Sequence, residues 1–370
     1  MKLLHTSDWH LGKTLKGANL LDDQVFILER LFDIINDTKP DAVLITGDIY
    51  DRAVPPADAV ELFDATLNRL AERNLPTLII AGNHDSSTRL NFGSKLFAQQ
   101  KIHIATKTLD EPAQIVLADD FGDVYFSLIP YFEPSAVADG ERLTYNAANQ
   151  LYVERARQKI PAGKRSVAMA HVFLTGGVES ESERKFVGGS ANVDAQIFSG
   201  YDYVALGHLH RPQKISAEHI RYAGSPLKYS FSEADHKKSV TIVELDGAGA
   251  VKTEKISLTP KRDLVVAKGT FNELLQRPTT HDYAQIVLTD DAYIYDTERL
   301  REVYPNFLEV KHENHLASYD EAASNFCKEE PVSEQFAKFF EEITGAALTD
   351  DERAAFEDFL RELESAEREA

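Results

Sequence analysis

Apolar runs and polar clusters alternate along the first hundred positions of the chain. Three short runs, residues 2–6, 42–46 and 77–81, have the length and composition of buried strands. Between them, apolar residues recur at spacings of three and four, which is the pattern of a helix with one buried face. The two stripes consist of Val25, Leu28, Phe32 and Ile35, and of Val60, Phe63, Leu67 and Leu70. Strands that alternate with helices predict an α/β fold with a parallel sheet.

A polar cluster follows each of these predicted strands directly. The three clusters read SDWH, GDIYDR and GNHD, and two later apolar runs, residues 166–170 and 203–206, lead into histidine at AHVF and GHLH. Ligands of open α/β sheets bind at the carboxyl ends of the strands. We therefore expect the chemistry of this chain along one edge of one sheet.

The pattern changes near residue 260. Two strand-like runs, at 264–270 and 283–289, are separated by a short helical run and followed by TERLREVYP and FLEVKH, which predicts a small second α/β domain. From residue 333 onward the pattern is helical. We therefore predict a first domain at 1–262, a small α/β domain at 263–332 and a helical tail at 333–370.

The tail predicts two amphipathic helices. Gly345 is expected to end the first, and Thr349 with Glu352 forms a capping box before the second. The apolar stripes are Phe336, Phe340 and Ile343 on the first helix, and Phe356, Leu360 and Leu363 on the second. Such faces belong more often to an intramolecular core, but two short amphipathic helices at an acidic chain end are also typical of a docking segment.

The composition restricts the classes of function. The chain of 370 residues carries a formal net charge of −20 and a single cysteine, Cys327. One cysteine excludes an intramolecular disulfide and a zinc site built from several thiolates. No run reaches the roughly 18 apolar residues of a membrane-spanning helix and the start is not leader-like, so we expect a cytoplasmic protein. The negative charge, taken alone, argues against a nucleic-acid partner.

Oxygen and imidazole donors gather at the predicted strand ends. Strand alternation lets an Asp and a His two positions apart face one ion, and a carboxylate whose two oxygens bind separately can bridge two ions. The donors are Asp8, His10, Asp48, Asn83, His171, His208 and His210. This set without thiolate suits Mn²⁺, Fe²⁺ or Zn²⁺ better than Mg²⁺ alone. Because seven donors exceed what one ion takes from a protein, we expect two cations.

The order of these motifs resembles a known superfamily. D-x-H, G-D, G-N-H-D, H and G-H-x-H follow one another as in the calcineurin-like metallophosphoesterases. Within that superfamily, LLHTSDWHLGK, GDIYDR, and GHLHRPQ followed by YAGSPLKYSF resemble the SbcD family, bacterial relatives of the Mre nuclease. The resemblance implies an α/β metallophosphoesterase domain with two β-sheets flanked by helices, a small α/β capping domain and a helical C-terminal tail.

The resemblance also implies a role for each motif residue. Carried over by position, one metal is held by Asp8, His10, Asp48 and His210, and the other by Asp48, Asn83, His171 and His208. His84 is then the histidine that binds no metal and stabilises the transition state or protonates the leaving oxygen after in-line attack on phosphorus. Asp85 is expected to orient His84.

Four further residues have less certain roles. Relatives outside bacteria have a histidine three positions after the bridging aspartate, where this chain has Asp51. Arg52 either contacts a phosphate or forms an ion pair with Asp51. Lys13 is either a phosphate contact or a solvated surface residue, and Ser225 either contacts the substrate backbone or belongs to an ordinary turn.

The implied function is a two-metal, Mn²⁺-dependent DNA phosphodiesterase. As the nuclease subunit of an SbcCD-like complex it would act as a double-strand 3′-to-5′ exonuclease and a single-strand or hairpin endonuclease in DNA repair, recombination and replication. The tail would dock an SbcC-like ATPase, and the chain would form a homodimer within a heterotetramer. An ATPase partner would ease the conflict with the negative charge, since DNA affinity need not come from this chain alone.

Two other functions fit parts of the sequence. A phosphatase of the same superfamily, acting on small-molecule or protein phosphates, is favoured by GDIYDR, which is similar to the GDxxDR of Ser/Thr phosphatases. SDWHLG and GNHD argue against it, because those phosphatases have GDxHG and GNHE. The second is a non-catalytic scaffold that tethers DNA ends, and the complete donor set argues against that.

Overall fold

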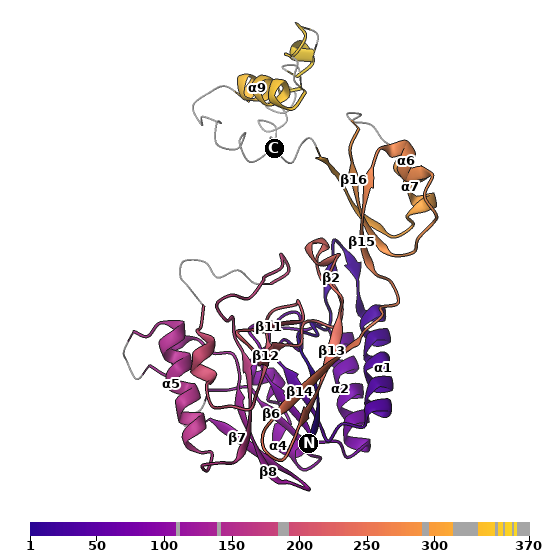
Figure 1. Cartoon of the computed structure of the whole chain (residues 1–370). Coiled ribbons are helices and arrows are strands. Elements are labelled where there is room, and N and C mark those ends of the chain that lie inside the picture. Colours follow the sequence, from indigo (N-terminus) through magenta and orange to yellow (C-terminus); the bar gives the residue numbers. More distant parts are fainter. Residues whose placement is uncertain are drawn as a thin grey trace. The chain divides into compact units, whose positions relative to one another are not determined.

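The structure is a computed structural model, and it divides into two units (Figure 1). Unit 1 comprises Met1–Val265 and unit 2 comprises Val266–Ala370. The residues described are 1–108, 112–138, 142–183, 192–290, 296–313, 332–344, 347–350, 352–356 and 359–360. Among the helices in these ranges, none combines the length and hydropathy that a membrane crossing requires.

The first sheet of unit 1 contains the three strands predicted from the N-terminal apolar runs. Four strands run parallel, β1 (Lys2–Thr6), β4 (Ala42–Thr46), β5 (Thr77–Ile80) and β6 (Ile102–Ala105). Two antiparallel strands, β13 (Ser239–Leu245) and β14 (Val251–Ser257), complete the order β14-β13-β1-β4-β5-β6. The strand assignments of the sequence analysis are confirmed here.

The second sheet holds the strands that lead into the later histidines. Its order is β11-β12-β10-β9-β8-β7. The strands are β7 (Ala113–Asp119), β8 (Gly122–Ile129), β9 (Arg165–His171), β10 (Tyr203–Gly207), β11 (Gln213–Ile215) and β12 (Ala217–Tyr222). The expectation of one sheet was therefore wrong, because apolar runs show where strands lie but not which strands pair.

The two sheets of unit 1 pack face to face. One buried cluster joins Leu44 and Leu78 of the first sheet to Phe126, Met169 and Ala205 of the second. Because both sheets end their parallel strands next to each other, donors from two sheets meet at one place.

Helices cover the outer faces of this sandwich, as expected for two sheets flanked by helices. Helices α1 (Leu21–Thr38) and α2 (Ala57–Glu72) lie side by side at one flank in Figure 1, and α5 (Tyr145–Gln158) lies at the opposite flank. Tyr152 and Val153 of α5 belong to a second buried cluster with residues of β9 and β10.

Two residues of the predicted helix stripes lie outside the core. Val25 and Val60 are 41% and 43% exposed. On α1 the buried arc is instead completed by Gln24, Ile27 and Leu31. Spacings of three and four identify the buried face of a helix but locate its centre only to within about one residue. Residues at the edge of that face can therefore be buried or exposed.

Short elements complete unit 1. They are the strands β2 (Thr14–Leu15) and β3 (Ala18–Asn19), the helices α3 (Ser87–Leu90) and α4 (Ser94–Ala98), and the 3-10 turns η1 (Pro134–Ala136), η2 (Ala195–Phe198) and η3 (Phe231–Glu233).

The chain continues into a three-stranded sheet of order β15-β16-β17. Its elements are β15 (Leu264–Gly269), α6 (Phe271–Leu275), β16 (Tyr283–Leu288), α7 (Thr297–Val303) and β17 (Phe307–His312). These elements occur in the predicted order. The thin sheet and short helices make a small α/β module.

The described part of the tail contains α9 (Val332–Thr344). The predicted capping box is present, since Thr349 N donates to Glu352 Oε2 at 2.9 Å and Glu352 N donates to Thr349 Oγ1 at 3.3 Å. The ring of Phe336 stacks on that of Phe356 with centroids 3.7 Å apart, so these two aromatic residues pack on each other. Gly345 and Leu363 lie outside the described residues.

Candidate metal centre

The loops after β1 and β4 are joined by backbone hydrogen bonds. Asp8 N donates to Gly47 O at 3.1 Å, and His10 N donates to Asp48 O at 3.0 Å. Asp8, His10 and Asp48 have φ values of 53°, 46° and 48°, a region that residues other than glycine rarely adopt. Strand alternation is thus not what aligns Asp8 with His10, because β1 ends at Thr6. Left-handed turns held by the neighbouring loop align them instead.

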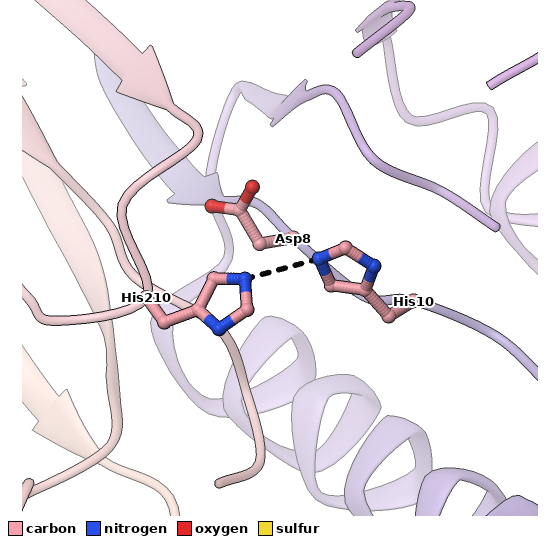
Figure 2. Close-up of side chains that lie close together, drawn as sticks. All are labelled: Asp8, His10 and His210. Atoms are coloured by element: carbon pink, nitrogen blue, oxygen red, sulfur yellow. Dashed lines mark hydrogen bonds between the residues drawn. The ribbon is translucent and has the colours of Figure 1, made fainter. Parts of the chain in front are cut away.

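Asp8, His10 and His210 form the first donor group. One potential ligand atom from each lies within 4.8 Å of the others, and all three side chains are buried. Figure 2 shows the two imidazole rings meeting through their Nε2 atoms, 3.0 Å apart, with the Asp8 carboxylate beside them. Two nitrogens each about 2.1 Å from one ion and at a right angle would lie about 3.0 Å apart. The spacing therefore fits a shared cation.

Asn83, His171 and His208 form the second donor group. Asn83 Oδ1 lies 3.0 Å from His171 Nε2 and 3.0 Å from His208 Nδ1. His171 Nδ1 lies 2.9 Å from the carbonyl oxygen of Thr46, to which it can only donate. Its Nε2 therefore carries the lone pair in the neutral ring and faces the Asn83 oxygen. When His171 is neutral, two acceptor atoms thus point at one another, an arrangement that a cation between them would stabilise.

Asp48 lies between the two donor groups. Its Oδ2 is 3.7 Å from His10 Nε2 and 3.3 Å from His171 Nε2, while Oδ1 accepts a hydrogen bond from His84 N at 2.9 Å. We expected the two oxygens of Asp48 to bind separate ions, whereas Oδ2 alone faces both donor groups. Gly82 permits this approach, because a Cβ there would lie 2.2 Å from Asp48 Oδ1.

The titration of the imidazoles follows from their burial and from Asp48. Burial lowers the pKa of His10 to about 4 and that of His208 to about 3, so both rings are neutral near pH 7. Burial alone would also lower the pKa of His171, but the charge of Asp48 and a hydrogen bond to it raise that pKa to about 9. A cation bound here would release the His171 proton, since only a neutral imidazole can be a ligand.

His84 lies beside the first donor group. Its Nδ1 donates to the carbonyl oxygen of Asp51 at 2.7 Å, and its ring centroid is 4.8 Å from that of His10. The side chain is partly exposed. A ligand atom of His84 also lies within 4.8 Å of ligand atoms of His10 and Asp48. The ring is thus held by the backbone next to the donors.

Asp85 has a different partner from the one expected. Its carboxylate accepts hydrogen bonds from Gly82 N at 2.9 Å, Ile49 N at 3.1 Å and Tyr50 N at 3.0 Å. It therefore ties the GNHD loop to the loop after β4, and the group that orients the His84 ring is the Asp51 carbonyl. Burial and the charge of Asp48 raise the pKa of Asp85 to about 7.

The three residues expected to contact substrate lie in different surroundings. Lys13 Nζ forms an ion pair with Asp51 Oδ1 at 2.8 Å, and Asp51 is also 3.6 Å from His10 Nδ1. Arg52 is exposed, and among the described residues the ion-pair partners of Asp51 are Lys13 and His10 rather than Arg52. Ser225 is fully buried and donates to Leu227 O at 2.7 Å, which favours the turn over the substrate contact.

Four residues near the site had not been recognised from the sequence. Glu233 and Lys238 form a buried ion pair behind His210, and Ser182 and Glu183 also contact that histidine. They occur in polar stretches without a motif, so no pattern in the sequence distinguishes them from surface residues.

Two family models match parts of this chain. The model described as calcineurin-like phosphoesterase matches residues 1–212, and the model described as type 5 capsule protein repressor C-terminal domain matches residues 260–344. The first match covers all seven donor residues and His84.

Curated relatives resemble almost the whole chain. The SbcD subunit of the SbcCD nuclease from Staphylococcus epidermidis is 34% identical over 83% of this chain and 84% of its own length. The protein of the same name from Staphylococcus saprophyticus is 31% identical over 98% of both chains. Among solved structures, TT1561 of Thermus thermophilus is 14% identical, with a TM-score of 0.41 over 69% of this chain and 98% of its own, a likeness too distant to add to these matches.

Proposed function

Because the chain belongs to the SbcD nuclease family of calcineurin-like phosphoesterases, we propose that it cuts DNA with two divalent cations as the nuclease subunit of an SbcCD-like complex. The observation that carries the proposal is the position of Asp48 Oδ2 between the two donor groups, 3.7 Å from His10 Nε2 and 3.3 Å from His171 Nε2. One carboxylate shared by two sets of donors supports two neighbouring ions.

Each donor group would hold one cation. Asp8, His10 and His210 would bind the first, Asn83, His171 and His208 the second, and Asp48 would contact both. When bound, the cations would neutralise charge that develops on the phosphate and lower the pKa of an attacking water. Mixed oxygen and imidazole donors without thiolate support Mn²⁺, Fe²⁺ or Zn²⁺ over Mg²⁺, and among these three the resemblance to the SbcD family favours Mn²⁺.

His84 would act on the phosphate or the leaving oxygen. The Asp51 carbonyl accepts its Nδ1 proton at 2.7 Å, which fixes the ring and turns Nε2 away from this backbone contact. A protonated Nε2 can stabilise a phosphate oxygen or give a proton to the leaving group. His84 is partly exposed, as is Asn83, whereas the other six donors are buried; this exposure supports a role of His84 towards the substrate.

DNA is the substrate that the family membership supports. The matched relatives are named as subunits of the SbcCD nuclease. We propose the same assembly for this chain, with an SbcC-like ATPase docked through the tail at 333–370 and a homodimer of this chain within a heterotetramer. Double-strand 3′-to-5′ exonuclease and single-strand or hairpin endonuclease activities would serve DNA repair in the cytoplasm. A partner would ease the conflict with the net charge of −20, because DNA affinity need not come from this chain alone.

One assay separates this function from its rivals. Purified chain, alone and with its ATPase partner, is given Mn²⁺ and either hairpin DNA or p-nitrophenyl phosphate. The proposal predicts DNA cleavage that chelation abolishes. Hydrolysis of p-nitrophenyl phosphate without DNA cleavage would establish a phosphatase, and DNA binding without any hydrolysis would establish a scaffold.

A further inference from the structure

A buried chain of hydrogen bonds runs from Lys238 to the ring of His210. We propose that Glu233 is a positioning residue of the first cation site: it fixes the proton of His210 on Nδ1 and so keeps Nε2 available for the metal. This inference rests on the proposed two-cation function, because it concerns one ligand of that site.

The hydrogen-bond directions determine where the His210 proton lies. His210 Nδ1 is 2.8 Å from Ser182 Oγ and 3.2 Å from Glu233 Oε1. Ser182 Oγ donates its own proton to Glu233 Oε1 at 2.5 Å, and an ionised carboxylate can only accept. Both neighbours of Nδ1 are therefore acceptors for it, so Nδ1 must carry the proton. The lone pair of the neutral ring is then on Nε2, the atom that faces His10 at 3.0 Å.

Lys238 holds the Glu233 carboxylate in place. Its Nζ donates to Glu233 Oε2 at 2.5 Å, to the His210 carbonyl at 2.8 Å and to Ser225 Oγ at 2.8 Å, which uses all three of its protons. Glu233 is 0% exposed and Lys238 is 5% exposed. A buried ion pair seldom adds net stability, because removing both charges from water costs as much as their attraction returns. Glu233 contacts the ring of His210 and Lys238 contacts its backbone carbonyl, so we infer that the pair positions His210.

The two cation sites differ in the group that accepts the Nδ1 proton of a ligating histidine. In the second site, His171 Nδ1 donates to a neutral backbone carbonyl, that of Thr46 at 2.9 Å. In the first site, the partner of His210 Nδ1 is a buried carboxylate, that of Glu233, which is paired with Lys238. A carboxylate behind a metal-binding histidine fixes the ring and raises its basicity. Loss of Glu233 should therefore weaken one site and spare the other.

Manganese titration of the full-length chain tests this asymmetry. Mn²⁺ binding is followed by electron paramagnetic resonance and calorimetry in wild type, Glu233→Gln, and Glu233→Leu/Lys238→Met, in which the pair is replaced by apolar side chains of similar size. We expect one of two sites to lose about 10- to 100-fold in affinity, with the smaller loss for Gln, which keeps an oxygen acceptor. Asp119→Asn, which breaks the Arg165 ion pair elsewhere in unit 1, controls for a general loss of stability.

A background variant identifies the affected site. In His210→Ala, Glu233→Leu/Lys238→Met should cause no further loss of Mn²⁺ affinity. In His171→Ala, the same change should weaken the remaining site. Equal losses in both backgrounds would overturn the proposal, as would unchanged affinity in folded variants.

A second readout needs no metal. Long-range proton–nitrogen spectra are recorded on metal-free chain with ¹⁵N-labelled histidine, and the His210 signal is assigned as the one missing in His210→Ala. We expect His210 to be protonated at Nδ1 in wild type. In Glu233→Leu/Lys238→Met we expect a shift towards the Nε2–H form. An unchanged tautomer would overturn the proposal. If wild type binds two Mn²⁺ but cuts no DNA, the proposed function fails while the titration still decides the role of Glu233. If wild type binds no Mn²⁺, the proposed function and this inference both fail.

Discussion

His10 Nε2 and His210 Nε2 lie 3.0 Å apart, although the two residues are separated by 200 positions in the chain. His10 follows β1 of the first sheet and His210 follows β10 of the second. The first donor group thus exists only when the two sheets are packed together. Metal binding should therefore depend on the interface between the sheets as well as on the donors themselves.

Gly207 is the position where this dependence can be tested. A Cβ there would lie 1.8 Å from the carbonyl oxygen of Thr46, a backbone atom that cannot move without shifting β4. We expect Gly207→Ala to lower the free energy of unfolding by about 1–3 kcal/mol or more and to weaken Mn²⁺ binding. Urea unfolding and Mn²⁺ titration measure the two effects. Gly269→Ala is the control, because the nearest atoms there end flexible side chains; equal effects of both variants would contradict the account.

Replacing Asp48 should affect both cations. Asp48→Asn keeps the size of the side chain but removes the charge next to His10 and His171. We expect Mn²⁺ affinity at both sites to fall by more than about 100-fold, the upper loss for a group that only supports a ligand. Asp8→Asn should weaken one site. Calorimetry that finds one site intact in Asp48→Asn would refute the shared carboxylate.

His84 should be needed for cleavage and dispensable for metal binding. We expect His84→Gln to bind two Mn²⁺ with unchanged affinity and to cleave DNA about 10²- to 10⁴-fold more slowly, the range for loss of a proton donor. Single-turnover cleavage at saturating Mn²⁺ measures this. His281→Gln, at an exposed position, should behave as wild type. Loss of a cation in His84→Gln would make His84 a ligand.

His5 should make the fold sensitive to acid. Its ring is buried between Tyr203 Oη and Thr46 Oγ1, and burial lowers its pKa to about 3 from an ordinary value of 6.5. Below pH 6.5 the unfolded chain binds a proton at His5 and the folded chain does not. The contribution of His5 to the free energy of unfolding is therefore fully present above pH 6.5. It is lost as the pH falls from 6.5 to 3, by up to about 1.4 kcal/mol per pH unit.

Comparison of wild type with His5→Asn isolates this contribution. Urea unfolding of metal-free protein at pH 7, 6 and 5 should show wild type losing stability faster than the variant as the pH falls. The acid dependence of all other groups is common to both proteins. Parallel losses would mean that His5 titrates alike in the folded and unfolded chains.

The sequence predicted local features better than their assembly. Strands 2–6 and 42–46 and the order of elements after residue 264 follow from apolar periodicity and length, which depend on neighbouring residues. The division of the strands between two sheets does not, because pairing depends on distant residues. The same holds for Val25, whose place at the edge of a buried arc is decided by what α1 packs against.

The site shows the same limit. Asp8, His10, Asp48, Asn83, His171, His208 and His210 could be recognised because motifs mark them, and the structure brings all seven together. The contacts of Asp85 with backbone amides could not be predicted, since neither its spacing nor its type distinguishes a loop anchor from a partner of His84. Glu233 and Lys238 were missed because burial of a charged pair leaves no local pattern.

The most direct test of the central claim is anomalous diffraction at the manganese absorption edge from crystals soaked in Mn²⁺. Our account predicts two peaks, one among Asp8, His10 and His210 and one among Asn83, His171 and His208, with the Asp48 carboxylate in contact with both. A single peak, or two peaks without Asp48 between them, would contradict it.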